Sequence, residues 1–341
     1  MYDYVIVTHI PVFYKVNLYN ELSKKLNIHV VFIASNTEEK RSDDFIDIKN
    51  INFEHTILFD GDFQTRNQYK SIKNLREIIK NLNYKKVLVS GWDLKEFWYL
   101  VFFNEKQKNS LALESTLFES TAVGLKGFIK KVFLSRVSIV FASGDLHVEL
   151  LKKLTYLSNV KITKGVGIIN KPEFLKIPKK YQKNFLYIGR LSKVKNLEVL
   201  IDIFNELKGY SLTIVGIGED EKYLKDKANQ NVIFLGSIQN SYLKQIFQEN
   251  DMLILPSISE PWGLVVEEAL YFGLPILVSK NCGSRELVEE GKNGFIINPK
   301  NQESIKKKIL QIDEKEYEKL LDGVKRFSIS DKDKLQVEAY L

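Results

Sequence analysis

The sequence has little of what disulfide-rich, metal-binding, disordered or membrane-spanning proteins need. It has one cysteine, Cys282, which excludes a disulfide framework and any zinc site built on cysteines. Its four histidines show no metal-ligand spacing, and a 44% hydrophobic chain with only seven prolines is not a disordered one. Its apolar runs all fall short of the ~18 residues of a membrane span, and its start lacks the basic segment of a signal peptide. We therefore expect a soluble, cytoplasmic protein of two domains of roughly 150 residues each.

Positive charge is concentrated in one part of the chain. Residues 151–200 contain 12 Lys and Arg against 2 Asp and Glu, whereas the whole chain has a net charge of +7. Such a cluster beside a domain junction indicates a cleft for a phosphorylated ligand or a patch that faces an anionic membrane. A solvated lysine-rich linker has the same composition and stays an alternative. A nucleic-acid-binding protein would spread basic and aromatic residues over one face, so no nucleic-acid partner is predicted.

Short apolar runs alternate with amphipathic stretches along most of the chain. The runs are continuous and rich in Val, Ile, Leu and Phe, which is typical of strands buried on both faces of a parallel sheet. Their alternation with helical patterns predicts a doubly wound α/β architecture. The predicted strands are Tyr4–Thr8, Ile28–Ala34, Lys86–Ser90, Leu111–Glu114, Ile139–Ala142, Phe185–Ile188, Ser211–Val215, Val232–Leu235, Met252–Leu255, Pro275–Val278 and Gly294–Ile297. The predicted helices include Asn17–Leu26, Ser71–Leu82, Val194–Leu207, Tyr242–Gln248 and Gln302–Ile312.

Two prolines and a run of lysines interrupt this alternation at Lys171–Lys183, where we place the domain boundary. The first domain then covers residues 1–170, the second 171–327, and a closing helix 328–341. Each domain has enough strands for its own open sheet. Two Rossmann-like domains that face each other would bind a ligand in the crevice between the carboxyl ends of their strands.

The densest group of polar residues and glycines follows the predicted strand Met252–Leu255. From Ser259 to Leu270 it reads Ser-Glu-Pro-Trp-Gly-Leu-Val-Val-Glu-Glu-Ala-Leu. Glu260 falls in the loop and Glu268 one turn into the following helix, so both carboxylates can reach one elongated ligand and accept hydrogen bonds from sugar hydroxyls. The exposed amides at the helix start suit a diphosphate. They belong to Gly263, Leu264 and Val265.

A second group of polar residues follows the first strand of the second domain. It runs from Tyr187 to Asn196 and contains Gly189, Arg190 and Lys195. An arginine can form two hydrogen bonds to phosphate oxygens, and a lysine adds a mobile point charge. These two side chains therefore suit a phosphorylated ligand.

Together the two groups resemble the retaining glycosyltransferases of the GT-B fold in glycosyltransferase family 4. The family pattern is a glutamate, then Phe or Trp with Gly-Leu, then Glu-Ala and a Gly-x-Pro strand start, and all of these are present between Glu260 and Pro275. Gly-Arg-Leu followed by Lys-Asn is similar to the family's turn that neutralises the donor diphosphate. The resemblance covers about residues 160–300.

The resemblance implies two Rossmann-like domains that face each other across a cleft. It also implies a metal-independent transfer of a sugar from a nucleoside-diphosphate sugar to an acceptor hydroxyl, with retention of configuration. In that picture Arg190 and Lys195 bind the diphosphate and Glu260 contacts the sugar, all three as catalytic residues. The donor-binding residues it implies are Glu268 at the ribose, Gly189, Gly216, Gly236, Trp262, Gly263, Leu264 and Val265.

The first domain matches the family less well. Many relatives have paired glycines where this chain has His9–Phe13, and a histidine where it has Glu114. We assign His9 and Lys15 to the acceptor side of the site, and Glu114 to contacting or orienting the acceptor as a fourth catalytic residue. A purely structural histidine at position 9 is the alternative.

The predicted acceptor is a saccharide, in free or lipid-linked form, in bacterial cell-surface polysaccharide or lipopolysaccharide assembly. Peripheral attachment at the inner face of the membrane would follow. Asp60-Gly61-Asp62 has the spelling of a metal site of another glycosyltransferase fold, but we interpret it as a turn and predict no metal or other cofactor. The alternatives are a nucleotide-sugar epimerase of the same fold, a sugar phosphorylase, and a non-catalytic carbohydrate or membrane-surface binder.

Overall fold

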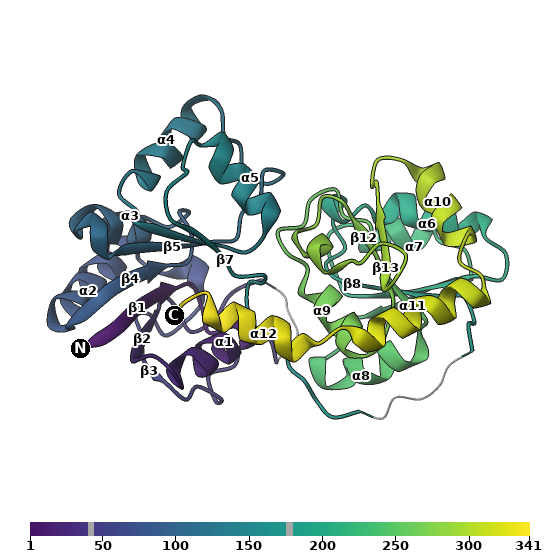
Figure 1. Ribbon diagram of the computed structural model, residues 1–341, viewed down its shortest axis with the longest axis horizontal. Coiled ribbons are helices and arrows are strands. Elements are labelled where there is room, and N and C mark those ends of the chain that lie inside the picture. Colours follow the sequence, from purple (N-terminus) through teal and green to yellow (C-terminus); the bar gives the residue numbers. More distant parts are fainter. Residues whose placement is uncertain (40–43, 175–179) are drawn as a thin grey trace. The chain divides into compact units, whose positions relative to one another are not determined.

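The computed structural model describes residues 1–39, 44–174 and 180–341. It divides into two compact units: unit 1 is Met1–Asn170 with Lys332–Leu341, and unit 2 is Lys171–Asp331. Each unit has one parallel sheet with helices packed on it (Figure 1). Residues 175–179, inside the predicted lysine-rich boundary, lie outside the described residues.

Unit 1 is built on a seven-stranded parallel sheet in the order β3-β2-β1-β4-β5-β6-β7. Its chain order reverses between β1 and β4, whose register pairs Val5 with Val87 and Val7 with Val89. The loops that follow these two strands run to opposite sides and leave a crevice at the carboxyl edge of the sheet. The strands are β1 (Tyr2–Thr8), β2 (Ile28–Phe32), β3 (Glu54–Ile57), β4 (Tyr84–Val89), β5 (Asn109–Leu113), β6 (Ile139–Ala142) and β7 (Val160–Ile162).

Helices cover both faces of this sheet because alternate strand residues are buried on opposite sides. Val5 and Val7 belong to a core closed by α2 (Gln68–Asn81), α3 (Lys95–Phe103), α4 (Gly124–Leu134) and α5 (Asp145–Lys153). Ile6 belongs to the other core, which is closed by α1 (Phe13–Ser23) and the end of α12 (Ile329–Glu338). Beyond α12, the ring of Tyr340 stacks on Phe141 with 4.4 Å between centroids. Short 3-10 helices are η1 (Phe63–Thr65) and η2 (Lys106–Lys108).

Unit 2 is built on a six-stranded parallel sheet in the order β10-β9-β8-β11-β12-β13. Here the chain order reverses between β8 and β11. The strands are β8 (Asn184–Ile188), β9 (Ser211–Val215), β10 (Val232–Gly236), β11 (Met252–Leu255), β12 (Ile276–Ser279) and β13 (Gly294–Ile297). The helices are α6 (Leu197–Glu206), α7 (Glu221–Lys227), α8 (Asn240–Glu249), α9 (Leu264–Tyr271), α10 (Gln302–Leu310) and α11 (Glu314–Arg326), with η3 (Lys193–Lys195) and η4 (Gly283–Leu287).

The predicted α/β class with two parallel sheets is confirmed, and every predicted strand overlaps an observed one. The structure adds β3 and β7, the two edge strands of unit 1. Both strands are short, and none of their residues is fully buried. Neither strand therefore forms a continuous apolar run. Within the described residues no helix is both long and apolar enough to cross a bilayer.

The basic segment 151–200 is divided between the two units. Lys161 in β7 lies 5.9 Å from the ring centre of Phe141, and Lys183 at the start of unit 2 lies 5.0 Å from that of Tyr210. Lys176 and Lys179 lie outside the described residues. The charge excess of this segment is therefore spread over strands, helices and loops, and the predicted linker accounts for only part of it.

Candidate active site

The two predicted donor motifs of unit 2 lie on the loops after β8 and β11, the strands between which the chain order reverses. The amide of Ile258 donates to the carbonyl oxygen of Val194 at 2.8 Å and joins the two loops. Asn196 ends η3 in the left-handed conformation, with φ of 60°. Its side-chain amide donates to the carbonyl oxygens of Pro256 at 3.2 Å and Pro299 at 2.8 Å. This asparagine therefore fixes the loop after β8 to the loops after β11 and β13.

An ion pair between Lys195 and Glu260 lies at the centre of these loops. The ammonium of Lys195 bonds to Oε2 of Glu260, and the two side chains are 10% and 14% exposed. The Ser257 hydroxyl lies 3.5 Å from the same carboxylate oxygen. Desolvated charges are costly unless they are paired. The pair therefore keeps one cation and one carboxylate together at the carboxyl edge of the sheet, where a ligand can replace either partner.

Arg190 is exposed on a turn that a buried tyrosine supports. Tyr187 is fully buried, and its hydroxyl donates to the carbonyl oxygen of Arg190 at 2.9 Å. Burial, together with the nearby Glu260 carboxylate, raises the pKa of Tyr187 well above its ordinary value. The phenol therefore stays a hydrogen-bond donor at neutral pH. No pattern in the sequence indicates this role, because a tyrosine inside an apolar run is typical of a core residue.

The three predicted glycines at the ends of β8, β9 and β10 pack against one another. The amide of Gly216 donates to the carbonyl oxygen of Gly236 at 2.7 Å, and the amide of Gly189 donates to Val215 at 3.0 Å. Gly216 has a φ of 131°, and a Cβ there would lie 1.9 Å from the carbonyl oxygen of Gly189. Only glycine lets the turns after β8 and β9 approach this closely.

Helix α9 begins directly after Gly263, which has a left-handed φ of 89°. No side chain among the described residues caps this helix start. Its first amides, which include those of Leu264 and Val265, carry the partial positive charge of a helix N-terminus. Glu260 lies beside them, since its Cγ is 3.2 Å from the position of a Cβ on Gly263. Glu268 follows one turn later and is half-buried.

Trp262 lies inside unit 2 and not on its surface. Its side chain is buried, and Nε1–H donates to Oε1 of the fully buried Glu267 at 2.6 Å. Its carbonyl oxygen accepts from the amide of Ser284 at 2.9 Å. The resemblance implies that Trp262 contacts the donor, but its indole packs in the interior of unit 2. Glu267, which was not predicted to have a role, is its partner.

The three residues predicted for the acceptor side line one cavity of unit 1. The cavity has a volume of about 400 Å³ and includes His9 after β1, Lys15 on α1 and Glu114 after β5. Lys15 is buried and paired with the Glu114 carboxylate. Burial alone would lower the pKa of Lys15, but the carboxylate beside it raises the pKa above its ordinary value. Lys15 therefore stays charged.

His9 pairs with an acidic residue that the sequence did not single out. Its Nε2 lies 2.8 Å from Oδ2 of Asp93, which follows β4 and lines the same cavity. The ring packs against Phe63 and Phe97, with centroids 5.5 and 5.3 Å away. Burial would raise the pKa of Asp93, but the bond to His9 brings it below its ordinary value. A lone aspartate in a short loop has no spacing pattern that could have revealed this pair.

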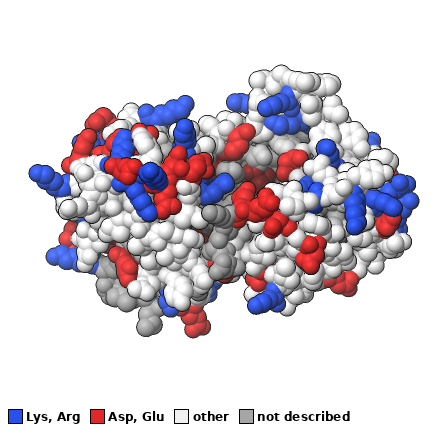
Figure 2. Space-filling model, turned by 180° about the vertical axis from the view of Figure 1, so that it is seen from behind, with Lys and Arg blue, Asp and Glu red and all other residues white. Residues whose placement is uncertain are grey.

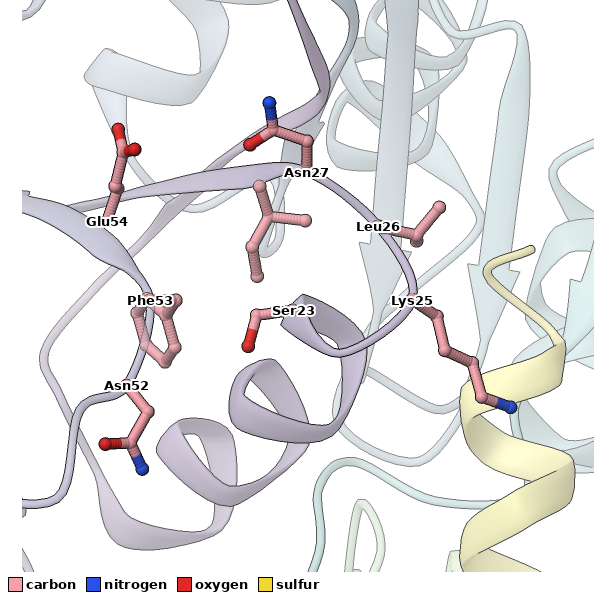
Figure 3. Close-up of a pocket in the computed structure, with 8 residues that line it drawn as sticks. Ser23, Lys25, Leu26, Asn27, Asn52, Phe53 and Glu54 are labelled. Atoms are coloured by element: carbon pink, nitrogen blue, oxygen red, sulfur yellow. The ribbon is translucent and has the colours of Figure 1, made fainter.

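A second cavity of unit 1 lies at the opposite edge of the sheet. It has a volume of about 370 Å³ and is lined by side chains at the starts of β2 and β3, among them Lys25, Asn27, Asn52 and Glu54 (Figure 3). None of the predicted site residues lines it. Ligands of open parallel sheets bind at the carboxyl ends of the strands, so we leave this cavity out of the site.

Comparison with known proteins identifies the second unit. Residues 170–326 match the family model of group 1 glycosyl transferases. The chain carries a group 1 glycosyltransferase domain. An uncharacterised glycosyltransferase of Methanocaldococcus jannaschii is 34% identical over 132 residues, which cover 36% of this chain and 34% of that protein. The match thus spans about a third of that relative's length. An uncharacterised glycosyltransferase of Haemophilus influenzae is 27% identical over 308 residues, which cover 86% of this chain and 83% of the other.

Solved structures extend the match to the whole fold. The lipopolysaccharide outer core galactosyltransferase WaaB, in its apo form, superposes with a TM-score of 0.72 at 17% identity and 98% coverage of both chains. Anabaena HepE in complex with UDP-glucose superposes with a TM-score of 0.74 at 15% identity, also with 98% coverage of both chains. At these identities the likeness is one of fold, and the predicted GT-B fold is confirmed.

Proposed function

We propose that the protein is a retaining glycosyltransferase that moves a sugar from a nucleoside-diphosphate sugar to an acceptor hydroxyl. One observation supports this most directly: the Lys195–Glu260 pair lies where the chain order of the group 1 glycosyltransferase domain reverses, beside the first amides of α9. The exposed Arg190 is on the loop that precedes Lys195. Cations, amides and a carboxylate are the groups that a sugar diphosphate requires.

The donor binds by exchanging partners with the ion pair. Diphosphate oxygens take the place of Glu260 beside Lys195, and Arg190 and the α9 amides bind the remaining oxygens. The Glu260 carboxylate is then available to accept hydrogen bonds from the sugar hydroxyls, and Glu268 binds the ribose. As the glycosidic bond breaks, negative charge builds on the leaving nucleoside diphosphate, and the cations stabilise it. We propose that they do so without a metal ion, so activity should persist in EDTA.

The acceptor binds in the cavity of unit 1. Nε2 of His9 pairs with Asp93, and in the neutral tautomer with its proton on Nε2 the ring accepts a hydrogen bond from a sugar hydroxyl at Nδ1. The Glu114 carboxylate, held by Lys15, orients a second hydroxyl. In the transfer, the acceptor oxygen bonds to the anomeric carbon on the face that the phosphate leaves, and the departing phosphate takes the proton of the hydroxyl. Configuration at the anomeric carbon is thereby retained.

We further propose that the acceptor is a lipid-linked saccharide in bacterial cell-surface polysaccharide or lipopolysaccharide assembly, at the cytoplasmic face of the membrane. WaaB, which shares the fold, is a lipopolysaccharide outer core galactosyltransferase by name, and this supports the proposed acceptor. Anabaena HepE, which also shares the fold, has been solved with UDP-glucose, and this supports a nucleotide sugar as the donor.

A thermal-shift panel tests the donor proposal. It compares UDP, GDP, ADP, CMP and orthophosphate on the wild type and on Glu268→Ala. A ligand at about 100 times its Kd adds roughly 2.7 kcal/mol to the free energy of unfolding, which raises Tm by several degrees. We expect one nucleoside diphosphate to stabilise the wild type and not the variant. A shift with orthophosphate alone would indicate a phosphorylase, sugar conversion without acceptor would indicate an epimerase, and no shift at all would contradict the proposal.

A further inference from the structure

Helix α4 presents an apolar face to solvent. Val123, Leu125, Phe128 and Ile129 are 76%, 74%, 63% and 43% exposed. We call these four residues, together with Lys126 and Lys131, the α4 surface. We propose that the α4 surface docks unit 1 on a lipid bilayer that contains anionic headgroups. The inference deepens the proposed function, because it names where an enzyme with a lipid-linked acceptor meets the membrane.

The exposure of the α4 surface is not a consequence of a loosely attached helix. Leu125, Phe128 and Ile129 have the i, i+3, i+4 spacing of one helix face. On the opposite face Leu134 is buried, and near the end of the helix Phe133 is fully buried and packs edge-on against Trp98, with 4.9 Å between centroids. Gly127 packs so closely that a Cβ there would lie 2.2 Å from the carbonyl oxygen of Ala122. The helix is therefore seated on the core by one side and turns its apolar stripe outward.

Basic residues predominate around this stripe, and the exposed Glu119, which lines a cavity together with Val123, is the acid nearest to it in the sequence. The sequence has no Asp or Glu from Ser120 to Gly144. Lys126 and Lys131 are exposed beside the apolar side chains, whereas Lys130 donates to Ser120 and to the carbonyl oxygen of Thr121. Figure 2 shows the surface over α4 as a white projection at the upper right, with blue Lys and Arg side chains beside it. Anionic headgroups would complement this charge.

A bilayer fits the α4 surface better than a second copy of the chain does. A helix that lies in the membrane interface has apolar side chains toward the acyl region and lysines toward the headgroups. A two-fold dimer through the same face would bring Lys126 and Lys131 of both copies into one interface, with Glu119 as the acid nearest in sequence to offset their charge. Single exposed apolar residues are ordinary on protein surfaces, but a contiguous group of four marks an interaction site.

The α4 surface is also connected to the acceptor cavity by a short stretch of chain. Glu114, which lines that cavity, and Gly124, which begins α4, are the two ends of the segment that leads from β5 to the helix. A membrane contact at α4 would therefore attach to the bilayer the same unit that contains the acceptor cavity. A saccharide on a lipid carrier would reach Glu114 from the same membrane.

Vesicle flotation tests the proposal on the full chain. We expect the wild type to float with vesicles of phosphatidylcholine and phosphatidylglycerol and far less with phosphatidylcholine alone. Raising salt from about 0.1 M to about 1 M, which shortens the Debye length from about 10 Å to about 3 Å, should weaken binding. The variant Leu125→Ser/Phe128→Ser should bind at least about tenfold more weakly. Because both side chains are exposed, its Tm and far-UV circular dichroism should match the wild type.

Matched variants on other surfaces of unit 1 are the controls. Tyr69→Ser/Leu157→Ser removes two equally exposed apolar side chains, of 82% and 78% exposure, and should bind like the wild type. For charge, Lys126→Glu/Lys131→Glu should abolish the preference for phosphatidylglycerol. Lys73→Glu/Lys80→Glu on α2 makes the same charge change away from the α4 surface and should keep most of the preference.

Three outcomes would overturn the inference: no binding of the wild type to either vesicle, equal binding by Leu125→Ser/Phe128→Ser, or a dimer in sedimentation velocity that this variant converts to monomer without any vesicle binding. The last would assign the α4 surface to a second copy. Sugar transfer to a soluble acceptor without vesicles tests the proposed function separately. Leu125→Ser/Phe128→Ser should leave that rate unchanged, so the two proposals can fail independently.

Discussion

The ammonium of Lys195 and the carboxylate of Glu260, 65 positions apart in the sequence, form an ion pair between the loops after β8 and β11. Neither side chain is more than 14% exposed. In the proposed reaction, the pair supplies one cation for a diphosphate and one carboxylate for a sugar at the same point of the sheet. The two charges come together because β8 and β11 are neighbours in the sheet of unit 2, and not because of a local motif.

Replacing Lys195 should impair catalysis. Removal of a preorganised charge that stabilises a leaving group costs about 3–4 kcal/mol of transition-state stabilisation. We therefore expect Lys195→Ala to lower kcat by about 100- to 1,000-fold in steady-state transfer assays. Lys193→Ala, two residues away and exposed, is the matched control and should stay near the wild-type rate. Comparable rates for the two variants would remove Lys195 from the reaction.

Replacing Asn196 should destabilise unit 2. Asn196→Ala leaves the carbonyl oxygens of Pro256 and Pro299 without their side-chain donor and places alanine at a left-handed φ. An unsatisfied buried polar group costs about 1–3 kcal/mol, and each kcal/mol lowers Tm by roughly 2–4 °C in a domain of this size. Calorimetry on Asn196→Ala and Asn196→Gly separates the causes, since glycine tolerates the φ but lacks the amide. An unchanged Tm in both would contradict the bracing role.

Breaking the Lys15–Glu114 pair should destabilise unit 1, and removing both charges should restore much of the loss. Lys15→Met leaves the carboxylate of Glu114 without its cation. Because that side chain is 32% exposed, we expect a cost of about 1–3 kcal/mol and not the larger cost of a fully buried pair. Urea unfolding of Lys15→Met, Glu114→Gln and the double variant gives the coupling. Strict additivity would show that the two side chains do not interact.

The lone cysteine should make the protein less stable in alkali. Burial, and next to it the Glu260 carboxylate, raises the pKa of Cys282 to about 12 from an ordinary 9.0. Above pH 9 the thiol ionises in the unfolded chain and not in the folded one, so the free energy of unfolding falls as pH rises toward 12. Urea unfolding between these limits should show a shallower pH slope for Cys282→Ala than for the wild type. Equal slopes would mean that the thiol titrates normally in the folded protein.

The strands that could be predicted are those with a continuous apolar run, most of them buried on both faces, although the partly exposed edge strand β10 was predicted in the same way. Continuous apolar runs such as Met252–Leu255 have no polar side and are typical of interior strands. The site is predicted on the loops that follow such strands, because open parallel sheets bind ligands at the carboxyl ends of their strands. The edge strands β3 and β7 were missed because a half-exposed strand of three or four residues looks like a loop. Helix α1 begins at Phe13, before the predicted Asn17, since no capping residue marks its start.

The parts of the site that could not be predicted depend on contacts distant in sequence. Asp93 lies 84 positions from His9, and nothing near either residue indicates the pairing. The resemblance implies a donor-binding role for Trp262, whereas its indole bonds to Glu267 in the interior of unit 2. Which aromatic side chains face inward is decided by packing, and the packing is a property of the folded unit.

The C-terminal helix α12 makes unit 2 an insertion within unit 1. The chain leaves unit 1 after Asn170 and re-enters it at Lys332. Residues 171–331 can therefore be expressed as one uninterrupted polypeptide, whereas no single cut releases unit 1 complete. A truncation that ends before Lys332 would remove Val337 and Tyr340 from the core beneath α1. Replacing unit 2 by another domain would accordingly require two splice points, and trimming the C-terminus would damage the unit that contains the N-terminus.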